Sequence, residues 1–313
     1  MRYDLTHVRH DPAHASCPGL FRSFLRGKGK QALHLTYAHG DRSIEIQAPF
    51  LLGAVDLWVL QGLIAMAVVH GKQLSLQNAV TEEGRQLAKN MNAIGVGPTD
   101  IAMAVAGGFS ELAREMGYAE PDSHSTRRIL QKSMERLFTV TMFVGDGDER
   151  QGYHLLSSYA SKLNGNTFNI GLNPMIATAV VGDARYISIP MGEIRAIRGD
   201  ATRLIHQRLC AFINEGATHP TPIRDTTLYE YIWHELEASP QPGMVNKVVK
   251  RAVRKLRGAE DDELDRKERE RAANLERYRR KKLKDAIDEL TSLGWVFDPR
   301  GKSFMVSRPE SSK

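Results

Sequence analysis

Cysteine is scarce in this sequence and long apolar runs are absent. The 313 residues contain only Cys17 and Cys210, too few for a disulfide scaffold, and a chain of this length can build a hydrophobic core without one. No run approaches the roughly 18 apolar residues of a membrane-spanning helix, and the first ten residues carry charges where a signal peptide is apolar. We therefore expect a cytoplasmic protein that is neither exported nor membrane-inserted.

Motifs for phosphate binding and strand cutting are also lacking. The sequence has no G-x-x-x-x-G-K-[ST] loop, and the glycines of Gly27-Lys-Gly-Lys30 lack that spacing, so no ATP site is expected. Rolling-circle nickases place two histidines around one hydrophobic residue, and neither His34-Leu-Thr nor His7-Val-Arg-His10 reproduces that pair. We expect no catalytic residue, no enzymatic activity and no cofactor.

The N-terminus nevertheless concentrates potential metal ligands, His7, His10, His14 and Cys17. Steps of three and four residues could bring imidazole and thiolate groups together on a helix. Pro12 lies in the middle of that run and disfavours such a helix. We therefore expect no metal site. Further along the chain, the sequence favours a buried packing role for His206 and Cys210, and for Trp58, Trp233 and Trp295.

Positive charge is concentrated in one segment. The net charge is only +6, yet 16 basic and 8 acidic residues lie between Val245 and Lys284, so an anionic partner is the first expectation. Val245–Leu256 has an apolar stripe and a basic opposite face, which suits DNA, an anionic membrane surface, a partner groove or packing on its own domain. Residues 260–293 lack glycine and proline and have supportive i,i+4 charge pairs, which predicts a long helix.

The first half of the chain is typical of an arm followed by a helical unit. Residues 1–45 hold several histidines and glycines and few apolar runs, so we expect an arm. Gly53–Val69 then predicts a buried helix, Thr81–Met91 a second helix and Ile101–Val105 a strand.

A helix-turn-helix pattern follows this strand. Phe109–Gly117 predicts a short helix with Ser110 as N-cap, and Ser123 opens a second helix that ends at Phe138. The β-rich stretch Thr139–Val144, the turn Gly145–Asp148 and later strands at 152–156 and 167–172 predict a β-wing.

The same order recurs in the second half. Ala201–Ile213, capped by Asp200, and Asp225–Trp233 predict helices, and the long helix precedes a hairpin with its turn at Asp298–Gly301. We therefore predict an α+β fold of two tandem winged-helix domains. Their expected ranges are 46–183 for the first and 184–313 for the second.

Three motifs together resemble a known family. They are His7-Val-Arg-His-Asp-Pro-Ala-His14 with Pro18-Gly-Leu-Phe21, then Arg203-Leu-Ile-His-Gln-Arg-Leu-Cys210, and finally Glu289-Leu-Thr-Ser-Leu-Gly-Trp295. The chain resembles RepC, the iteron-binding replication initiator of IncQ-type plasmids, from about Leu5 to Pro309. The resemblance implies a cytosolic protein with two winged-helix domains that binds direct repeats in double-stranded origin DNA. It also implies opening of adjacent AT-rich DNA and admission of a separate helicase and primase.

Residues suited to DNA contact lie on the second helix of each helix-turn-helix and on the last hairpin. A recognition helix needs polar or basic residues toward its N-terminal half and an apolar stripe behind them. The candidates in the first domain are Ser123, Ser125, Arg127, Arg128, Gln131 and Lys132. In the second domain they are Arg277, Arg280, Lys281 and Lys284, with Arg300 and Lys302 at the wing. The monomer and the homodimer are both left open as the DNA-binding form.

The segment 238–271 departs from the family pattern, in which the chain passes quickly from the Trp233 region to the Arg277 region. Either it is a long excursion that carries the Val245–Leu256 helix, or the recognition helix is extended backwards by several turns. We expect an accessory arm that adds non-specific DNA affinity through Lys247, Lys250, Arg251, Arg254, Lys255 and Arg257. The alternative function is that of a transcriptional repressor with the same two DNA-binding domains.

Overall fold

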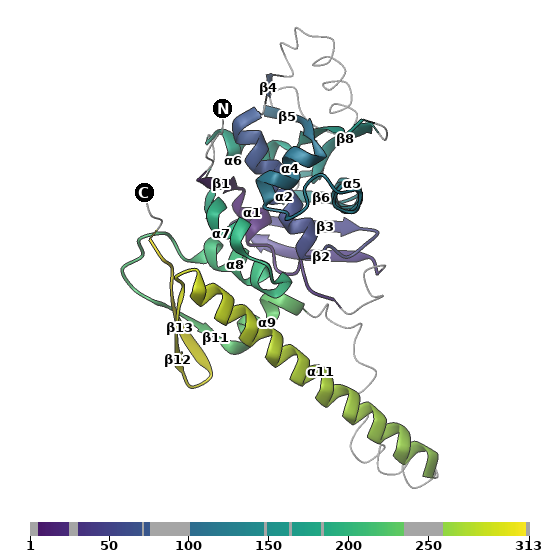
Figure 1. Ribbon diagram of the computed structural model, residues 1–313, viewed down its shortest axis with the longest axis vertical. Helices are drawn as coiled ribbons and strands as arrows, with labels where there is room; N and C mark the ends of the chain where they lie inside the picture. Colours follow the sequence, from purple (N-terminus) through teal and green to yellow (C-terminus); the bar gives the residue numbers. More distant parts are fainter. Residues whose placement is uncertain are drawn as a thin grey trace.

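Helices and antiparallel sheets alternate along the chain (Figure 1). The computed structural model describes residues 6–24, 31–70, 72–75, 101–146, 149–162, 165–182, 185–234 and 259–310. In these ranges the strands form one two-stranded, one three-stranded and two four-stranded sheets. The α+β class predicted from the sequence is confirmed.

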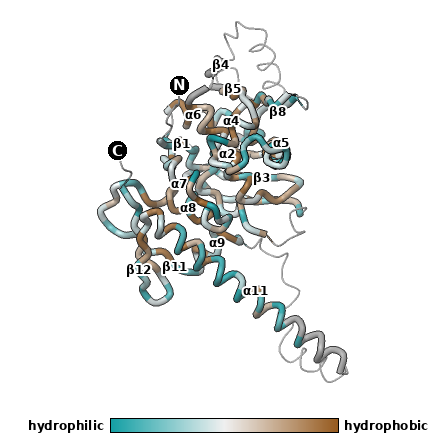
Figure 2. The backbone as a smooth tube through the Cα atoms, in the orientation of Figure 1, coloured by the Kyte–Doolittle hydropathy of each residue, from teal (hydrophilic) through white to brown (hydrophobic). Residues whose placement is uncertain are grey.

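Helix α2, Ala54–His70, lies at the centre of the hydrophobic core. Its sequence is apolar on nearly all sides, as expected for a helix that is covered all round. It packs against α5 (His124–Phe138) and against α8 (Asp200–Phe212), so helices from both halves of the chain share one core. Figure 2 shows α2 largely brown and the middle part of α11 largely teal. None of the described helices is long and apolar enough to cross a membrane.

The first repeated unit builds its sheet beside α2 with the strand order β4-β5-β9-β8. The strands are β4 (Lys72–Ser75), β5 (Ile101–Gly108), β8 (Leu156–Lys162) and β9 (Thr167–Leu172). Helix α4 (Phe109–Met116) follows β5 and ends at Gly117, whose φ of 81° is the left-handed conformation of a C-cap. Ser123 caps α5 as predicted, whereas α4 begins after Gly108 and not at Ser110.

The hairpin that follows α5 directly belongs to a different sheet. Strands β6 (Thr141–Asp146) and β7 (Glu149–His154) join β2 (Leu33–His39) and β3 (Arg42–Ala48) in the order β2-β3-β6-β7. The predicted wing grouped this hairpin with the strand at 167–172, and that grouping is wrong, because the two lie in different sheets and it is β8 and β9 that return to β5. Periodicity identifies strands, but Ile44 and Ile46 of β3 pair with Val144 and Met142 of β6 about a hundred residues later.

The second repeated unit follows the same plan. Its elements are α8, β11 (Thr221–Arg224), α9 (Asp225–Trp233), α11 (Ala259–Ser292), β12 (Val296–Arg300) and β13 (Ser303–Ser307). The strand order is β11-β13-β12, which matches β5-β9-β8 of the first unit. Each unit thus contains a first strand, two helices and a hairpin whose second strand pairs with the first strand. Asp200 is the first residue of α8 rather than its cap, which is Gly199.

The N-terminal segment is part of the core, which differs from the expected arm. Strand β1 (His7–His10) pairs with β10 (Ile187–Pro190), and α1 (Pro12–Ala15) starts with Pro12 at its first turn. Val8 and His10 are fully buried. Helix α6 (Pro174–Val181) packs on β1 and β5. The sequence of this segment did not predict its burial, because the strand that pairs with it, β10, lies about 180 residues later in the chain.

Candidate nucleic-acid interface

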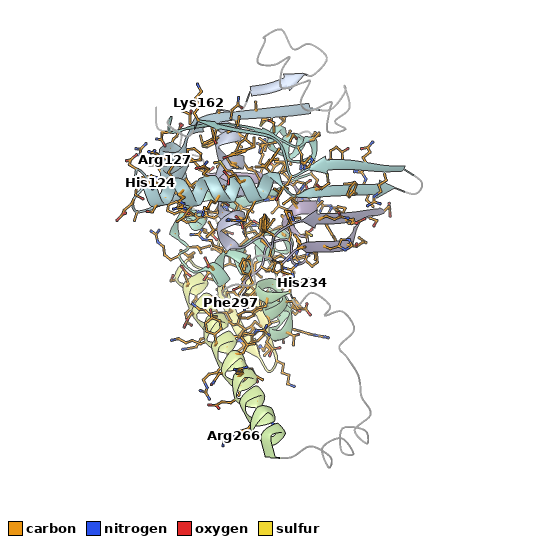
Figure 3. The ribbon with its side chains drawn as sticks, turned by 90° about the vertical axis from the view of Figure 1, so that its right-hand side faces the viewer. His124, Arg127, Lys162, His234, Arg266 and Phe297 are labelled. Carbon is orange, nitrogen blue, oxygen red and sulfur yellow. The ribbon has the colours of Figure 1, made fainter. Side chains whose placement is uncertain are left out.

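Helix α11 is held to the protein by its C-terminal part. It has 34 residues, a length of about 50 Å at 1.5 Å per residue. Leu283, Ala286 and Leu290 are buried, and this part packs on α8. The N-terminal part projects beyond the other elements (Figures 1 and 3), with Arg266 near its far end. Of the two arrangements predicted for the inserted segment, the extended helix is correct for residues 259–271.

Glu289 adds a polar attachment between α11 and α8. Its Oε1 accepts from the backbone N–H of Arg198 at 2.5 Å, and its Oε2 accepts from that of Gly199 at 3.1 Å. Oε2 also accepts from the hydroxyl of Thr202. Gly199 is the N-cap of α8 and has no side chain to cap it, so the carboxylate of Glu289 satisfies unpaired N–H groups there and complements the helix dipole.

The four basic residues predicted on this helix, Arg277, Arg280, Lys281 and Lys284, are all exposed. Arg280 pairs with Glu276 and Lys284 lies 3.8 Å from Asp288, both at i,i+4 spacing. Exposed pairs of this kind contribute about 0–1 kcal/mol, so they do not prevent either cation from binding a phosphate. This part of α11 therefore presents a basic face beside a firmly packed apolar stripe.

Charge changes sign along the length of α11. Residues 259–274 contain seven acidic and four basic side chains, whereas residues 275–284 contain one acidic and six basic side chains. Phosphate attracts the second stretch and repels the first. Only about three turns of the helix are therefore suited to lie against DNA.

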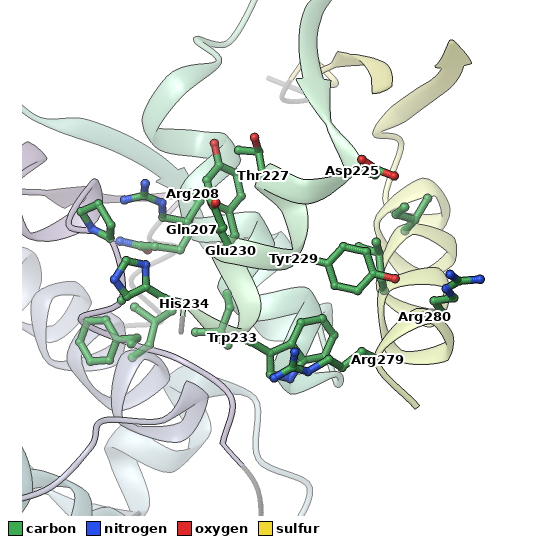
Figure 4. Close-up of a pocket in the computed structure, with 18 of the residues that line it drawn as sticks. Gln207, Arg208, Asp225, Thr227, Tyr229, Glu230, Trp233, His234, Arg279 and Arg280 are labelled. Atoms are coloured by element: carbon green, nitrogen blue, oxygen red, sulfur yellow. The ribbon is translucent and has the colours of Figure 1, made fainter. Parts of the chain in front are cut away.

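A large cavity of about 1370 Å³ lies between α9, α11 and the segment after α1. Figure 4 shows Trp233 beside Arg279 on the wall of this cavity. The guanidinium of Arg279 lies 5.4 Å from the centroid of Trp233, and Tyr229 stacks on the same ring at 5.4 Å. The buried packing role predicted for Trp233 is confirmed, since only 9% of it is exposed. Arg279 and Tyr229 are not among the residues predicted from the sequence. Each lies four residues before a buried residue of its helix, Leu283 and Trp233, and this spacing could have indicated that they pack inward.

The hairpin β12–β13 carries Arg300 and Lys302, both exposed. Arg300 pairs with Asp298 at 2.8 Å. The turn lies at Gly301 and Lys302, with Gly301 at a φ of 64°, rather than at the predicted 298–301. Both basic side chains are therefore located at the tip of the hairpin.

The base of this hairpin is attached to a buried polar cluster. The indole N–H of Trp295 donates to Oε2 of Glu193 at 2.8 Å, and Nε2 of His206 lies 2.7 Å from the same oxygen. Burial lowers the pKa of His206, but Cys210 and the Glu193 carboxylate raise it more strongly, to about 9. The predicted burial of His206, Cys210 and Trp295 is confirmed.

On the first unit, the predicted DNA-contact residues lie along α5 and at its N-cap. Ser125, Arg128 and Lys132 are exposed, while Arg127 and Gln131 are half-buried. The hydroxyl of Ser123 accepts from the N–H of Thr126 at 3.1 Å, so its first role is to cap the helix. Arg127 and Lys162, the latter at the end of β8, both lie at the outer edge of this unit (Figure 3).

Helix α5 is attached to α2 through a buried carboxylate. Arg136 donates to Oδ1 of Asp56 at 2.6 Å, and the hydroxyl of Ser133 donates to the same oxygen at 2.6 Å. Leu130, Met134 and Leu137 are fully buried beside this pair. The face that carries Arg128 and Lys132 is thereby held away from the core.

The comparisons with known proteins decide the family. The model of the family described as replication protein C (RepC) matches residues 2–261. The chain belongs to the RepC family. No curated protein sequence matches it at a significant level.

Among solved structures, two crystal structures of domains 2 and 3 of RctB are similar to this RepC-family chain. Both matches have 11% sequence identity. One, of a selenomethionine derivative, has a TM-score of 0.45 and covers 74% of this chain and 80% of that chain. The other has a TM-score of 0.43 and covers 72% and 77%. The two repeated units of this RepC-family chain are defined by its own strand pairings.

Two regions that the sequence singles out in this RepC-family chain lie outside the described residues. They are the six accessory basic residues between Lys247 and Arg257 and the predicted helix Thr81–Met91. Around the N-terminal histidines, no three His, Cys, Asp or Glu side chains converge as a metal site in the described ranges. His14 instead bonds to Asp11 at 2.5 Å and lies 3.0 Å from the sulfur of Met142.

Proposed function

We propose that this protein is a sequence-specific, double-stranded DNA-binding initiator of plasmid replication. It binds direct repeats, or iterons, at the origin and promotes opening of adjacent AT-rich DNA for loading of helicase and primase. The observation that carries the proposal is the repeated order of elements, which gives each half of a RepC-family chain an exposed basic helix in the same position.

Both units are proposed to be winged-helix domains. In this assignment α5 and the 275–284 part of α11 are the recognition helices, and the hairpins β8–β9 and β12–β13 are the wings. The strand orders β5-β9-β8 and β11-β13-β12 support it, because a wing must return its second strand beside the strand that precedes the helix pair. The boundary between the domains is placed near residues 183–189.

Each recognition helix then has a defined set of contacts. On α11, Arg277 and Arg280 are suited to bidentate contact with guanine, and Lys281 and Lys284 to phosphate neutralisation. On α5, Arg128 and Lys132 are the most exposed cations, with Ser125 near the helix start. Arg300 and Lys302, at the tip of the wing, contact the phosphate backbone of the DNA. The acidic part of α11 points away from the duplex, since it would otherwise face phosphate.

We propose that the protein is cytoplasmic and is not an enzyme. Duplex opening is proposed to follow from DNA binding rather than from nucleotide hydrolysis. The helicase and the primase are separate proteins in this scheme. The protein binds as a monomer with two reading helices, or as a homodimer with four. The basic residues between Lys247 and Arg257 are proposed to add non-specific affinity.

A binding assay tests the proposal. Fluorescence anisotropy should show that the protein prefers an origin repeat over shuffled DNA by about 10³-fold or more at physiological salt. The variants R277A/R280A and R128A/K132A should each lose most of this preference. The variant R266A/R271A removes two exposed charges from the acidic part of α11 and should retain it. Equal affinity of the wild-type protein for repeat and shuffled DNA would contradict the proposal.

A further inference from the structure

Residues 191–199 join the two repeated units and contact both of them. They comprise helix α7 (Met191–Ala196) and the three residues before α8. Toward the first unit, Arg195 donates from Nε to the backbone oxygen of Glu115 at 2.9 Å and from a terminal nitrogen to its carboxylate at 2.8 Å. Arg198 donates to the backbone oxygen of Gly117 at 3.2 Å. Both acceptors lie at the C-terminal end of α4, where the chain turns toward α5.

The same segment holds the second unit with different groups. The carboxylate of Glu193 accepts from His206 of α8 and from Trp295 at the base of the hairpin. The backbone N–H groups of Arg198 and Gly199 donate to Glu289 of α11. Arg198 thus binds the first unit with its side chain and the second unit with its backbone.

Packing makes this segment a rigid connection rather than a flexible linker. Ile194 and Ile197 are each 1% exposed. A Cβ atom on Gly117 would lie 3.2 Å from both Cβ and the backbone oxygen of Arg195, so the two units approach closely at a residue whose positive φ favours glycine. Motion of one unit against the other would break these contacts together.

We infer that residues 191–199 form a coupler that, together with the packing of α8 on α2, sets the spacing and the rotational phase of the two recognition helices. Arg195, Arg198 and Glu289 are then positioning residues, which determine the distance between half-sites that the protein accepts. The inference rests on the proposed function. Since B-DNA turns once in about 10–10.5 bp, each added base pair rotates one half-site by about 35° relative to the other, and a rigid coupler cannot follow that rotation.

The test measures affinity for repeats in which 1–5 bp are inserted between the two half-sites. The wild-type protein should lose at least tenfold at an insertion of about half a turn. R195A/R198A should bind the native repeat more weakly and lose less than about threefold over the same series. R42A/R185A removes the same charge at two exposed arginines outside the coupler and should keep the wild-type profile. The exchange E115R/R195E should restore the steep profile that either single change flattens.

A measurement without DNA gives a second readout. Spin labels at Arg128→Cys and Arg277→Cys report the distance between α5 and α11, and the native Cys17 and Cys210 are buried. The distance distribution should be narrow in the otherwise wild-type protein and broad in R195A/R198A. An unchanged spacing profile, or an equally narrow distribution in that variant, overturns the coupler and leaves the proposed function standing. Absence of any preference for the repeat in the wild-type protein overturns both.

Discussion

The carboxylate of Asp56 is 3% exposed and pairs with the guanidinium of Arg136 at 2.6 Å. This pair connects the central helix α2 to α5, and Ser133 donates to the same carboxylate. We predict that D56A lowers the free energy of unfolding by about 1–3 kcal/mol, because the change leaves the Ser133 hydroxyl and the Gly53 N–H without their buried acceptor. Denaturant titration measures this. The control D122A breaks an exposed pair with Arg114 and should change stability much less, because water screens that pair. Equal effects of the two variants would show that the Asp56 pair does not hold α5.

The salt dependence of DNA binding should report Lys281 and Lys284 directly. Each phosphate neutralised by a cation adds about 0.9 to the slope of log affinity against log salt. K281A/K284A should therefore lower the magnitude of the slope by the equivalent of up to about two phosphate contacts. The variant should bind repeat DNA and random DNA more weakly by similar factors. R266A/R271A, which removes two cations from the acidic part of α11, should leave the slope unchanged. An unaltered slope in K281A/K284A would remove these lysines from the interface.

An initiator and a transcriptional repressor should differ in what they do to the duplex. We predict that binding makes thymines in the AT-rich DNA beside the repeats reactive to permanganate, since opening unstacks those bases. The protein should open the duplex without ATP. A closed duplex at saturating protein on supercoiled origin DNA would favour the repressor. Nicked circles formed in the presence of Mg²⁺ would instead indicate an enzyme.

Stability should depend on pH through His206. Its pKa is raised from 6.5 to about 9 in the folded protein, so folding favours the protonated form. The stabilisation is complete below about pH 6.5, falls as the pH rises through 9, and amounts to about 3 kcal/mol. E193Q, which removes the carboxylate beside His206, should flatten the decline between pH 7 and 10. A stability that rises over this range in the wild-type protein would contradict the paired His206.

The sequence predicts local structure here better than it predicts which strands pair. Helices α5, α9 and α11 fall within one or two residues of their predicted ranges. Ser123 marks the start of α5, and the glycine-free stretch that ends before Gly294 marks α11. The hairpin β6–β7 is also found, but its partner strand β3 is specified by side chains about a hundred residues away. The N-terminal strand β1 is hidden for the same reason, since its burial depends on β10.

The candidate interface shows the same limit. Exposure of Arg277 and Lys281 follows from their positions opposite Leu283 and Leu290, so periodicity predicts it, whereas Arg280 and Lys284 border the cavity together with Leu283. The attachment of Glu289 to the N-terminus of α8 and the double contact of Arg198 depend on tertiary placement. No spacing in the sequence indicates either of them.

Hydroxyl-radical footprinting on the native plasmid origin measures whether both proposed recognition helices read DNA. Two recognition helices that read one repeat should enter successive major grooves on one face of the DNA, about 10 bp apart, and protect roughly 20 bp in each repeat. R128A/K132A and R277A/R280A should each remove one of the two protected patches. Protection of only a half-length site would contradict the account, because one of the two helices would then be structural and not a reader of DNA.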